Sequence, residues 1–277
     1  MTEGLVRNLY NGEWQNVFSK NERGWHKRGK ELLKKLIVQK RLYSFRAVLT
    51  TAPITDAEWC AEALESNNQL SLNGIITTNN VADQFQDISL VARIDRLSSV
   101  PWWAGRSPSV RLSRSITEYK KNLDIILRCA NSIMFIDRNL DPTKTRYQDF
   151  LSLFQEVARR NPLPLIEVHR VCYIGSGRDR EILKSSEWQK KFTDSWSDNF
   201  KTIGIEAEIF IWDDFHDRHV ISDLIGIKLG NGFDTTTNLS DITTWSRLGR
   251  DDRDDIQREF DPETHRHNLI HRFKIPQ

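Results

Sequence analysis

The chain of 277 residues is long enough for one large domain or two smaller ones, each able to bury a full core. Its 38% hydrophobic and 28% charged residues are typical of a soluble globular protein, and no apolar run is long enough to cross a membrane. The start, Met-Thr-Glu-Gly, lacks the pattern of a secretory signal, and three widely spaced cysteines predict buried, reduced thiols. We therefore expect a cytoplasmic protein rather than a membrane-spanning or disulfide-stapled one.

The N-terminal part carries both helix and strand signals. Residues 26–41 place Leu32, Leu33, Leu36 and Ile37 on one face, which predicts an amphipathic helix. The other expected elements are a strand at 42–50, a helix opened by the capping box at 55–58, turns at 67–68 and 79–80, a strand at 88–94, and a loop at 101–108. These signals predict a smaller α/β region over residues 1–112.

The second part, residues 113–277, has a more regular pattern. The expected elements are helices at 116–129, 147–160 and 185–200, strands at 132–137, 164–173, 206–212 and 268–275, a hairpin at 220–229, and an exposed loop at 250–263. Trp188, Phe192, Trp196 and Phe200 recur every four residues, which is typical of core packing. The alternation predicts an α/β fold with a largely parallel sheet and helices on both faces.

The most informative motif is His216-Asp-Arg218, followed by Asp223 and then by Gly230-Asn231-Gly232, which reads H-x-R-x4-D-x6-G-N-G. Residues two apart in a strand share a face, so His216 and Arg218 are expected side by side. A nucleophilic imidazole beside a cation suits phosphodiester cleavage, because the cation stabilises charge on the phosphate oxygens. Asp223 either orients the histidine or fixes the hairpin, and the glycines let the backbone approach a phosphate closely.

The motif resembles the H-x-K-x4-D signature of the phospholipase D superfamily, with Arg218 in the lysine position and Asn231 in place of a small hydroxyl residue. The order of elements from about residue 116 onward is also similar to that family. The resemblance implies a phospholipase D-like layered sheet, His216 as a metal-independent nucleophile, Arg218 and Asp223 as further catalytic residues, and phosphate contacts from Arg218, Asn231, Gly230 and Gly232. It implies no cofactor and no metal.

Enzymes of this family use two histidine motifs, and this chain has one. Activity therefore requires a homodimer in which two His216 side chains meet. The expected activity is that of a nuclease, and at the level of the family such single-motif domains occur in bacterial mobile-element or defence systems.

An alternative comes from the ending Gly230-Asn-Gly-Phe-Asp234. It is more similar to the phospholipase D-like domain of an ESCRT-associated protein with a microtubule-interacting-and-trafficking module, which is regarded as a non-catalytic lipid-binding domain. That resemblance implies an inactive module for nucleic-acid or lipid head-group phosphates. A third possibility is a structural subunit of a larger complex that docks through its N-terminal portion, with some of the nine tryptophans, several of them in loop-like segments, as interface anchors.

Two basic groups make nucleic acid the favoured partner. The predicted residues are Lys27, Arg28, Lys30, Lys34 and Lys35 in the first helix, with Arg106 and Arg111 near a pair of tryptophans. A solvated helix face is the alternative interpretation of the lysines.

Overall fold

The computed structural model describes residues 5–20, 27–38, 41–105, 107–175 and 177–276. The chain forms two compact units, Met1–Ser107 and Pro108–Gln277. The expected boundary after residue 112 lies inside a strand, β5 (Ser109–Ser113), which belongs to the large sheet of the second unit. Within the described ranges, no helix is both long and apolar enough to cross a membrane.

The first unit is a small α/β assembly with two parallel strand pairs, β1–β2 and β3–β4. Its elements are β1 (Val6–Asn8), α1 (Glu13–Lys20), α2 (Lys27–Val38), β2 (Leu42–Ser44), α3 (Asp56–Gln69), β3 (Ile75–Thr77), α4 (Asn79–Ala82), β4 (Val91–Arg93) and α5 (Pro101–Ala104). The capping box is present, because Thr55 Oγ1 accepts from the Glu58 amide and Glu58 accepts from the Thr55 amide.

Three local expectations for the first unit were wrong. The asparagine pairs at 67–68 and 79–80 lie inside α3 and α4 rather than in turns, and the expected loop at 101–108 begins with the short helix α5. Asparagine is only mildly unfavourable in a helix, so the strong start signal at Thr55 decides the course of α3.

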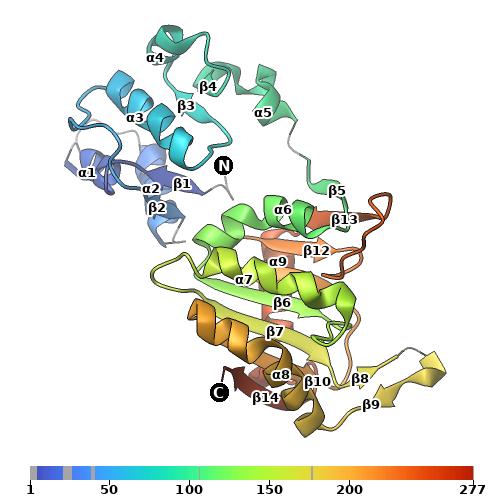
Figure 1. Cartoon of the computed structure of the whole chain (residues 1–277). Helices are drawn as coiled ribbons and strands as arrows, with labels where there is room; N and C mark the ends of the chain where they lie inside the picture. Colours follow the sequence, from blue (N-terminus) through green and yellow to red (C-terminus); the bar gives the residue numbers. More distant parts are fainter. Residues whose placement is uncertain (1–4, 21–26, 39–40, 106, 176, 277) are drawn as a thin grey trace. The chain divides into compact units, whose positions relative to one another are not determined.

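The second unit is built around an eight-stranded sheet in the order β14-β10-β7-β6-β11-β12-β13-β5 (Figure 1). Besides β5, its strands are β6 (Ser132–Asp137), β7 (Leu165–Val171), β10 (Ala207–Trp212), β11 (Arg218–Ser222), β12 (Gly226–Leu229), β13 (Ile242–Arg247) and β14 (Leu269–Ile275). A separate hairpin joins β8 (Tyr173–Ile174) to β9 (Glu181–Ile182). The helices are α6 (Ile116–Cys129), α7 (Leu151–Val157), α8 (Ser185–Ile203) and α9 (Arg250–Glu259).

The sheet is mixed, so the expectation of a largely parallel sheet was wrong. Only β6, β7 and β10 run parallel to one another, and every other neighbouring pair in this sheet is antiparallel. Parallel neighbours need long crossovers, which α7 and α8 provide, whereas β11 and β12 are joined by a tight turn that permits only antiparallel pairing.

Helices cover both faces of this sheet, which confirms the layered α/β architecture. Helices α6, α7 and α8 lie on one face (Figure 1). There the Phe135 ring of β6 packs against Phe150 and Phe154 at centroid distances of 5.2 and 5.5 Å. On the opposite face, His169 of β7 stacks on Phe210 at 4.6 Å and meets Phe260, which follows α9.

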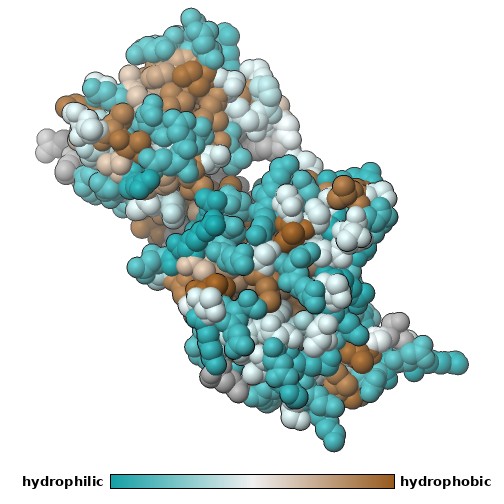
Figure 2. Space-filling model, viewed as in Figure 1, coloured by the Kyte–Doolittle hydropathy of each residue, from teal (hydrophilic) through white to brown (hydrophobic). Residues whose placement is uncertain are grey.

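The outer surface of the second unit agrees with this layering. Figure 2 shows that the face formed by α6, α7 and α8 is mainly hydrophilic, with small, separate hydrophobic areas. The apolar sides of these helices are buried, and the four aromatic residues of α8 predicted to face the core are at most 1% exposed. Cys60, Cys129 and Cys172 are also buried, and they form no disulfide.

Helix α9 corrects the expected loop at 250–263. Its sequence is rich in charges, and Ile256, which packs against the core, is its one apolar residue. The Arg253 side chain passes directly over Gly226, where a Cβ atom would lie 2.9 Å from Cγ of the arginine. Aliphatic parts of charged side chains therefore supply packing that a hydrophobicity pattern does not show.

Candidate functional site

The segment 213–217 crosses the sheet at the carboxyl ends of its parallel strands. It leaves the end of β10 and enters β11, which pairs with β6, so it passes the carboxyl ends of β7 and β6. Phe215 anchors it, because this ring is 4% exposed and packs 4.9 Å from Phe260. His216 and Asp217 follow on the exposed side. The topology thus places the histidine at the edge of an α/β sheet where ligands commonly bind.

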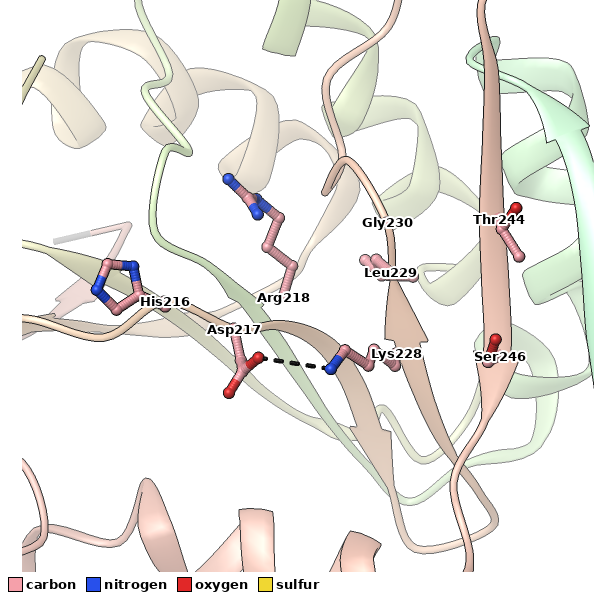
Figure 3. Close-up of a pocket in the computed structure, with 8 residues that line it drawn as sticks. All are labelled: His216, Asp217, Arg218, Lys228, Leu229, Gly230, Thr244 and Ser246. Atoms are coloured by element: carbon pink, nitrogen blue, oxygen red, sulfur yellow. Dashed lines mark ion pairs between the residues drawn. The ribbon is translucent and has the colours of Figure 1, made fainter. Parts of the chain in front are cut away.

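A pocket of about 270 Å³ opens beside this segment (Figure 3). Its walls come from the start of β11 and from β12 and β13, and they are formed by His216, Asp217, Arg218, Lys228, Leu229, Gly230, Thr244 and Ser246. Two cationic side chains, an imidazole, two hydroxyl groups and one carboxylate are among the groups that line it. The pocket therefore offers an excess of hydrogen-bond donors and positive charge to an anion.

Arg218 is held by a buried carboxylate. Its Nε lies 3.6 Å from Oδ1 of Asp137, whose side chain is completely buried at the end of β6. Burial raises the pKa of Asp137, although the amides of Phe233 and Asn139 and the charge of Arg218 act in the opposite direction. The Arg218 side chain is itself 25% exposed and forms part of the pocket wall, whereas its Nε is buried beside Asp137.

His216 has a different partner. Strand β11 begins at Arg218, so the histidine lies before the strand, and the expected shared strand face does not arise. Arg138, the residue after Asp137, donates from Nη1 to Nδ1 of His216 and from Nη2 to the Tyr173 hydroxyl at 2.6 Å. Figure 3 shows the imidazole and the Arg218 guanidinium group pointing in different directions.

Lys228, Thr244 and Ser246 were missed by the sequence analysis. Lys228 pairs with Ser246 across β12 and β13, and its Nζ lies 3.8 Å from Oδ1 of Asp217 (Figure 3). Thr244 lies two residues before Ser246 on the same face of β13. The signal that would have found them is the antiparallel register of β13, a strand that the sequence pattern did not reveal.

Asp223 lies at the other end of β11, away from the pocket. Its carboxylate accepts from the Asn131 amide and from Nδ2 of Asn131, both at 2.8 Å. Of the two roles expected for Asp223, the structure shows the one that fixes the hairpin, because these bonds tie the end of β11 to the start of β6.

The glycine segment, Gly230-Asn231-Gly232, has three residues with different surroundings. Gly230 lines the pocket, and Asn231 is exposed beside it. Gly232 is buried at φ +81°, and a methyl group there would lie 2.8 Å from Cγ of Asp137 and 3.0 Å from Cδ of Arg218. Gly232 therefore lets the backbone pass the ion pair, which is a different role from the predicted contact with phosphate.

The predicted nucleic-acid-binding residues are divided between the two units. Lys27, Arg28, Lys30, Lys34 and Lys35 lie in α2 of the first unit, with the last three exposed, whereas Arg111 is exposed on β5 of the second unit. Arg106 lies outside the described residues. Among the described residues, no group of three or more His, Cys, Asp or Glu side chains is arranged to hold a metal ion.

Comparisons with known proteins give no family assignment. No family model matches this chain, and no curated protein matches it. Among solved structures, TrmBL2, an archaeal chromatin protein, is 12% identical with a TM-score of 0.34, covering 87% of this chain and 82% of its own. Polyphosphate kinase from Porphyromonas gingivalis is 9% identical with a TM-score of 0.30; the match covers 92% of this chain but 44% of the kinase. At these TM-scores neither likeness supports an argument about fold or function.

Proposed function

We propose that the second unit, Pro108–Gln277, is a phosphate-binding module that holds a nucleic-acid phosphodiester in the pocket without cleaving it. The observation that carries the proposal is the placement of Arg218 and Lys228 around a pocket whose other walls supply hydroxyl groups and the backbone of Gly230. Arginine donates to phosphate oxygens in a planar fork, and charged donors form the stronger hydrogen bonds to such anions. The resemblance of the histidine motif to the phospholipase D signature supports the same ligand chemistry.

The contact between Arg138 and His216 argues against cleavage. A guanidinium group has donors only, so the Nδ1 atom that faces it must present its lone pair. The proton of the neutral imidazole then sits on Nε2. Neither ring nitrogen has a free lone pair for attack on phosphorus, because one accepts from Arg138 and the other carries the proton.

A histidine-dependent nuclease active as a homodimer is the second candidate. The observation in its favour is that His216 is exposed in the same pocket as Arg218. A second copy of the chain would have to bring its own His216 to the bound phosphate and displace Arg138 from Nδ1. A lipid head group could bind to the same pocket donors without displacing Arg138 from His216. The same holds if the module is a subunit of a larger complex.

Binding to a fluorescent single-stranded oligonucleotide, measured by anisotropy at several salt concentrations, tests the proposal. We expect Arg218→Ala to weaken binding about tenfold, which corresponds to about 1.4 kcal/mol, and to reduce the dependence on salt. The exposed Lys201 at the end of α8 provides a control substitution to alanine. Equal affinity for the wild-type protein and Arg218→Ala would overturn phosphate binding in this pocket.

Incubation of the same oligonucleotide with excess EDTA separates the two candidates. The binding module leaves the strand intact with both the wild-type protein and His216→Ala. Cleavage by the wild-type protein that disappears in His216→Ala would overturn the binding-only function and favour the nuclease.

A further inference from the structure

A second group of polar side chains adjoins the pocket without lining it. It consists of Arg138, Tyr173, Arg180 and Asp214. Arg138 follows β6 and Asp214 follows β10, whereas Tyr173 begins β8 and Arg180 precedes β9. The Tyr173 hydroxyl donates to Oδ1 of Asp214, and Arg180 Nη1 donates to Oδ2 at 3.2 Å. Through Arg138, which donates to both Tyr173 and His216, this arginine cluster is joined to the pocket.

The arginine cluster has more positive than negative charge. The two guanidinium groups lie 5.7 Å (Arg138) and 4.4 Å (Arg180) from the ring centroid of Tyr173. Asp214 is the carboxylate that the structure places against them, and its side chain is 42% exposed. Burial would raise the pKa of Asp214, but the Tyr173 hydroxyl and the two arginines outweigh it and lower the pKa. The carboxylate is thus ionised at neutral pH and balances one of the two arginines.

A buried arginine fixes the backbone that carries the cluster. Arg170 is 1% exposed and donates to the carbonyl groups of Leu140 at 2.8 Å and Tyr173 at 2.6 Å. Its guanidinium group lies 3.3 Å from the ring centroid of Trp188, and burial lowers its pKa to about 9, so it stays charged at neutral pH. The segments that hold Arg138 and Tyr173 are therefore tied to a common point before any ligand arrives, which lowers the entropic cost of binding.

We propose that Arg138 and Arg180 form a second anion subsite beside the pocket, so that the protein binds ligands with adjacent phosphate groups more tightly than ligands with one. This inference rests on the proposed phosphate binding in the pocket and assigns residues outside the histidine motif. A guanidinium group has five N–H donors, so Arg138 can keep its bond to His216 while its other donors, with those of Arg180, bind the oxygens of a phosphate through charged hydrogen bonds. The shared ligand chemistry is two phosphates in succession, as in a diphosphate or along a nucleic-acid strand.

Isothermal titration calorimetry of the full chain with inorganic phosphate, pyrophosphate and a short oligothymidylate tests the subsite. We expect Arg138→Ala and Arg180→Ala each to weaken binding of pyrophosphate or of the oligothymidylate about tenfold while changing the affinity for inorganic phosphate less than about twofold. The control is Arg178→Ala, since Arg178 is an exposed arginine of the same β8–β9 hairpin outside the cluster. Far-ultraviolet circular dichroism and thermal melting show whether each variant is folded.

The ligands distinguish the outcomes. If both arginine variants lose affinity for inorganic phosphate and pyrophosphate by the same factor, the cluster only shapes the pocket and the second subsite is wrong. Failure of the underlying pocket would instead appear as an unchanged affinity for inorganic phosphate in Arg218→Ala. A selective effect on the oligothymidylate alone assigns the subsite to a nucleic-acid strand, and a selective effect on pyrophosphate assigns it to a free diphosphate.

Discussion

Asp137 connects the candidate site to the core. Its carboxylate accepts from the Asn139 amide at 2.9 Å and from the Phe233 amide at 3.0 Å, and it faces Nε of Arg218. The backbone at Gly232 passes so close that any larger residue would have to displace this carboxylate or Arg218. One buried acid thus sets the position of the arginine, the turn after β6 and the glycine segment after β12.

The raised pKa of Asp137 predicts a distinctive pH dependence of stability. A carboxyl group with a higher pKa in the folded than in the unfolded state binds more protons when folded. Its contribution to the free energy of unfolding therefore falls as the pH rises from the ordinary value for Asp, about 3.9, to the raised value. We expect the difference in unfolding free energy between the wild-type protein and Asp137→Asn to decrease over this range in urea titrations.

Asp255 provides a control of opposite sign. Its pKa is lowered, chiefly by the hydrogen bond from Arg266, so its contribution to stability is present above the ordinary pKa and is lost as the pH falls. The difference between the wild-type protein and Asp255→Asn should therefore rise with pH below the ordinary value for Asp, about 3.9, whereas that for Asp137→Asn should fall with pH above it. Two differences of the same slope would contradict the assignment of a raised pKa to Asp137.

At the scale of elements, the crossing segment 213–217 and strand β11 create the site. Because β11 pairs with β6 rather than with its predecessor β10, a segment of five residues must pass the end of β7. That path brings His216 to Arg138 and Asp214 to Tyr173. The opposite end of β11 is secured separately by Asp223, which bonds to Asn131. One end of the strand therefore forms the pocket, and the other end stabilises the fold.

This division of tasks predicts the behaviour of Asp223→Ala. Asn131 is exposed, so water can bond to the groups that the substitution frees, and we expect the free energy of unfolding to fall by about 1 kcal/mol. The affinity for oligonucleotide should remain within about twofold of the wild-type value, since the pocket lies at the other end of β11. Loss of binding by folded Asp223→Ala would instead restore the catalytic or binding role expected from the motif.

Prediction from the sequence succeeded for elements with strong local signals. Helix α6 and strand β6 have the predicted bounds, and α8 and β14 differ from prediction by a few residues at one end. Strand β13 and helix α9 were missed or assigned to loops because their stability depends on neighbours. Trp245 of β13 is buried against Tyr119 of α6, a contact that no local pattern contains.

At the scale of the whole molecule, the two units differ in the size of their cores. The second unit has one continuous core that extends from Leu112 to Ile275. The main cluster of the first unit is centred on Leu9, Trp59 and Ala63, with a few partly buried residues around it. Because stability on folding grows with the apolar surface that is buried, the second unit has the means to fold independently.

A chain restricted to residues 108–277 should therefore unfold cooperatively in urea and bind inorganic phosphate as the full chain does. This shortened chain lacks the lysines of α2. If these lysines contact nucleic acid, the slope of log affinity against log salt concentration should become smaller by about 0.7 for each phosphate contact that is lost. Non-cooperative unfolding of this shortened chain would show that the first unit is needed for folding, and an unchanged salt slope would assign the lysines to a solvated face.

The sequence by itself determined the α/β layering and the buried aromatic face of α8, because periodicity is a local property of a chain, and it placed His216 and Arg218 two residues apart. Only the tertiary structure decided which partners these two residues have. Arg138 against His216, Asp137 beneath Arg218 and Lys228 across from Ser246 come from segments far apart along the chain. Strand order and register bring them together, and these depend on packing between elements rather than on any one of them.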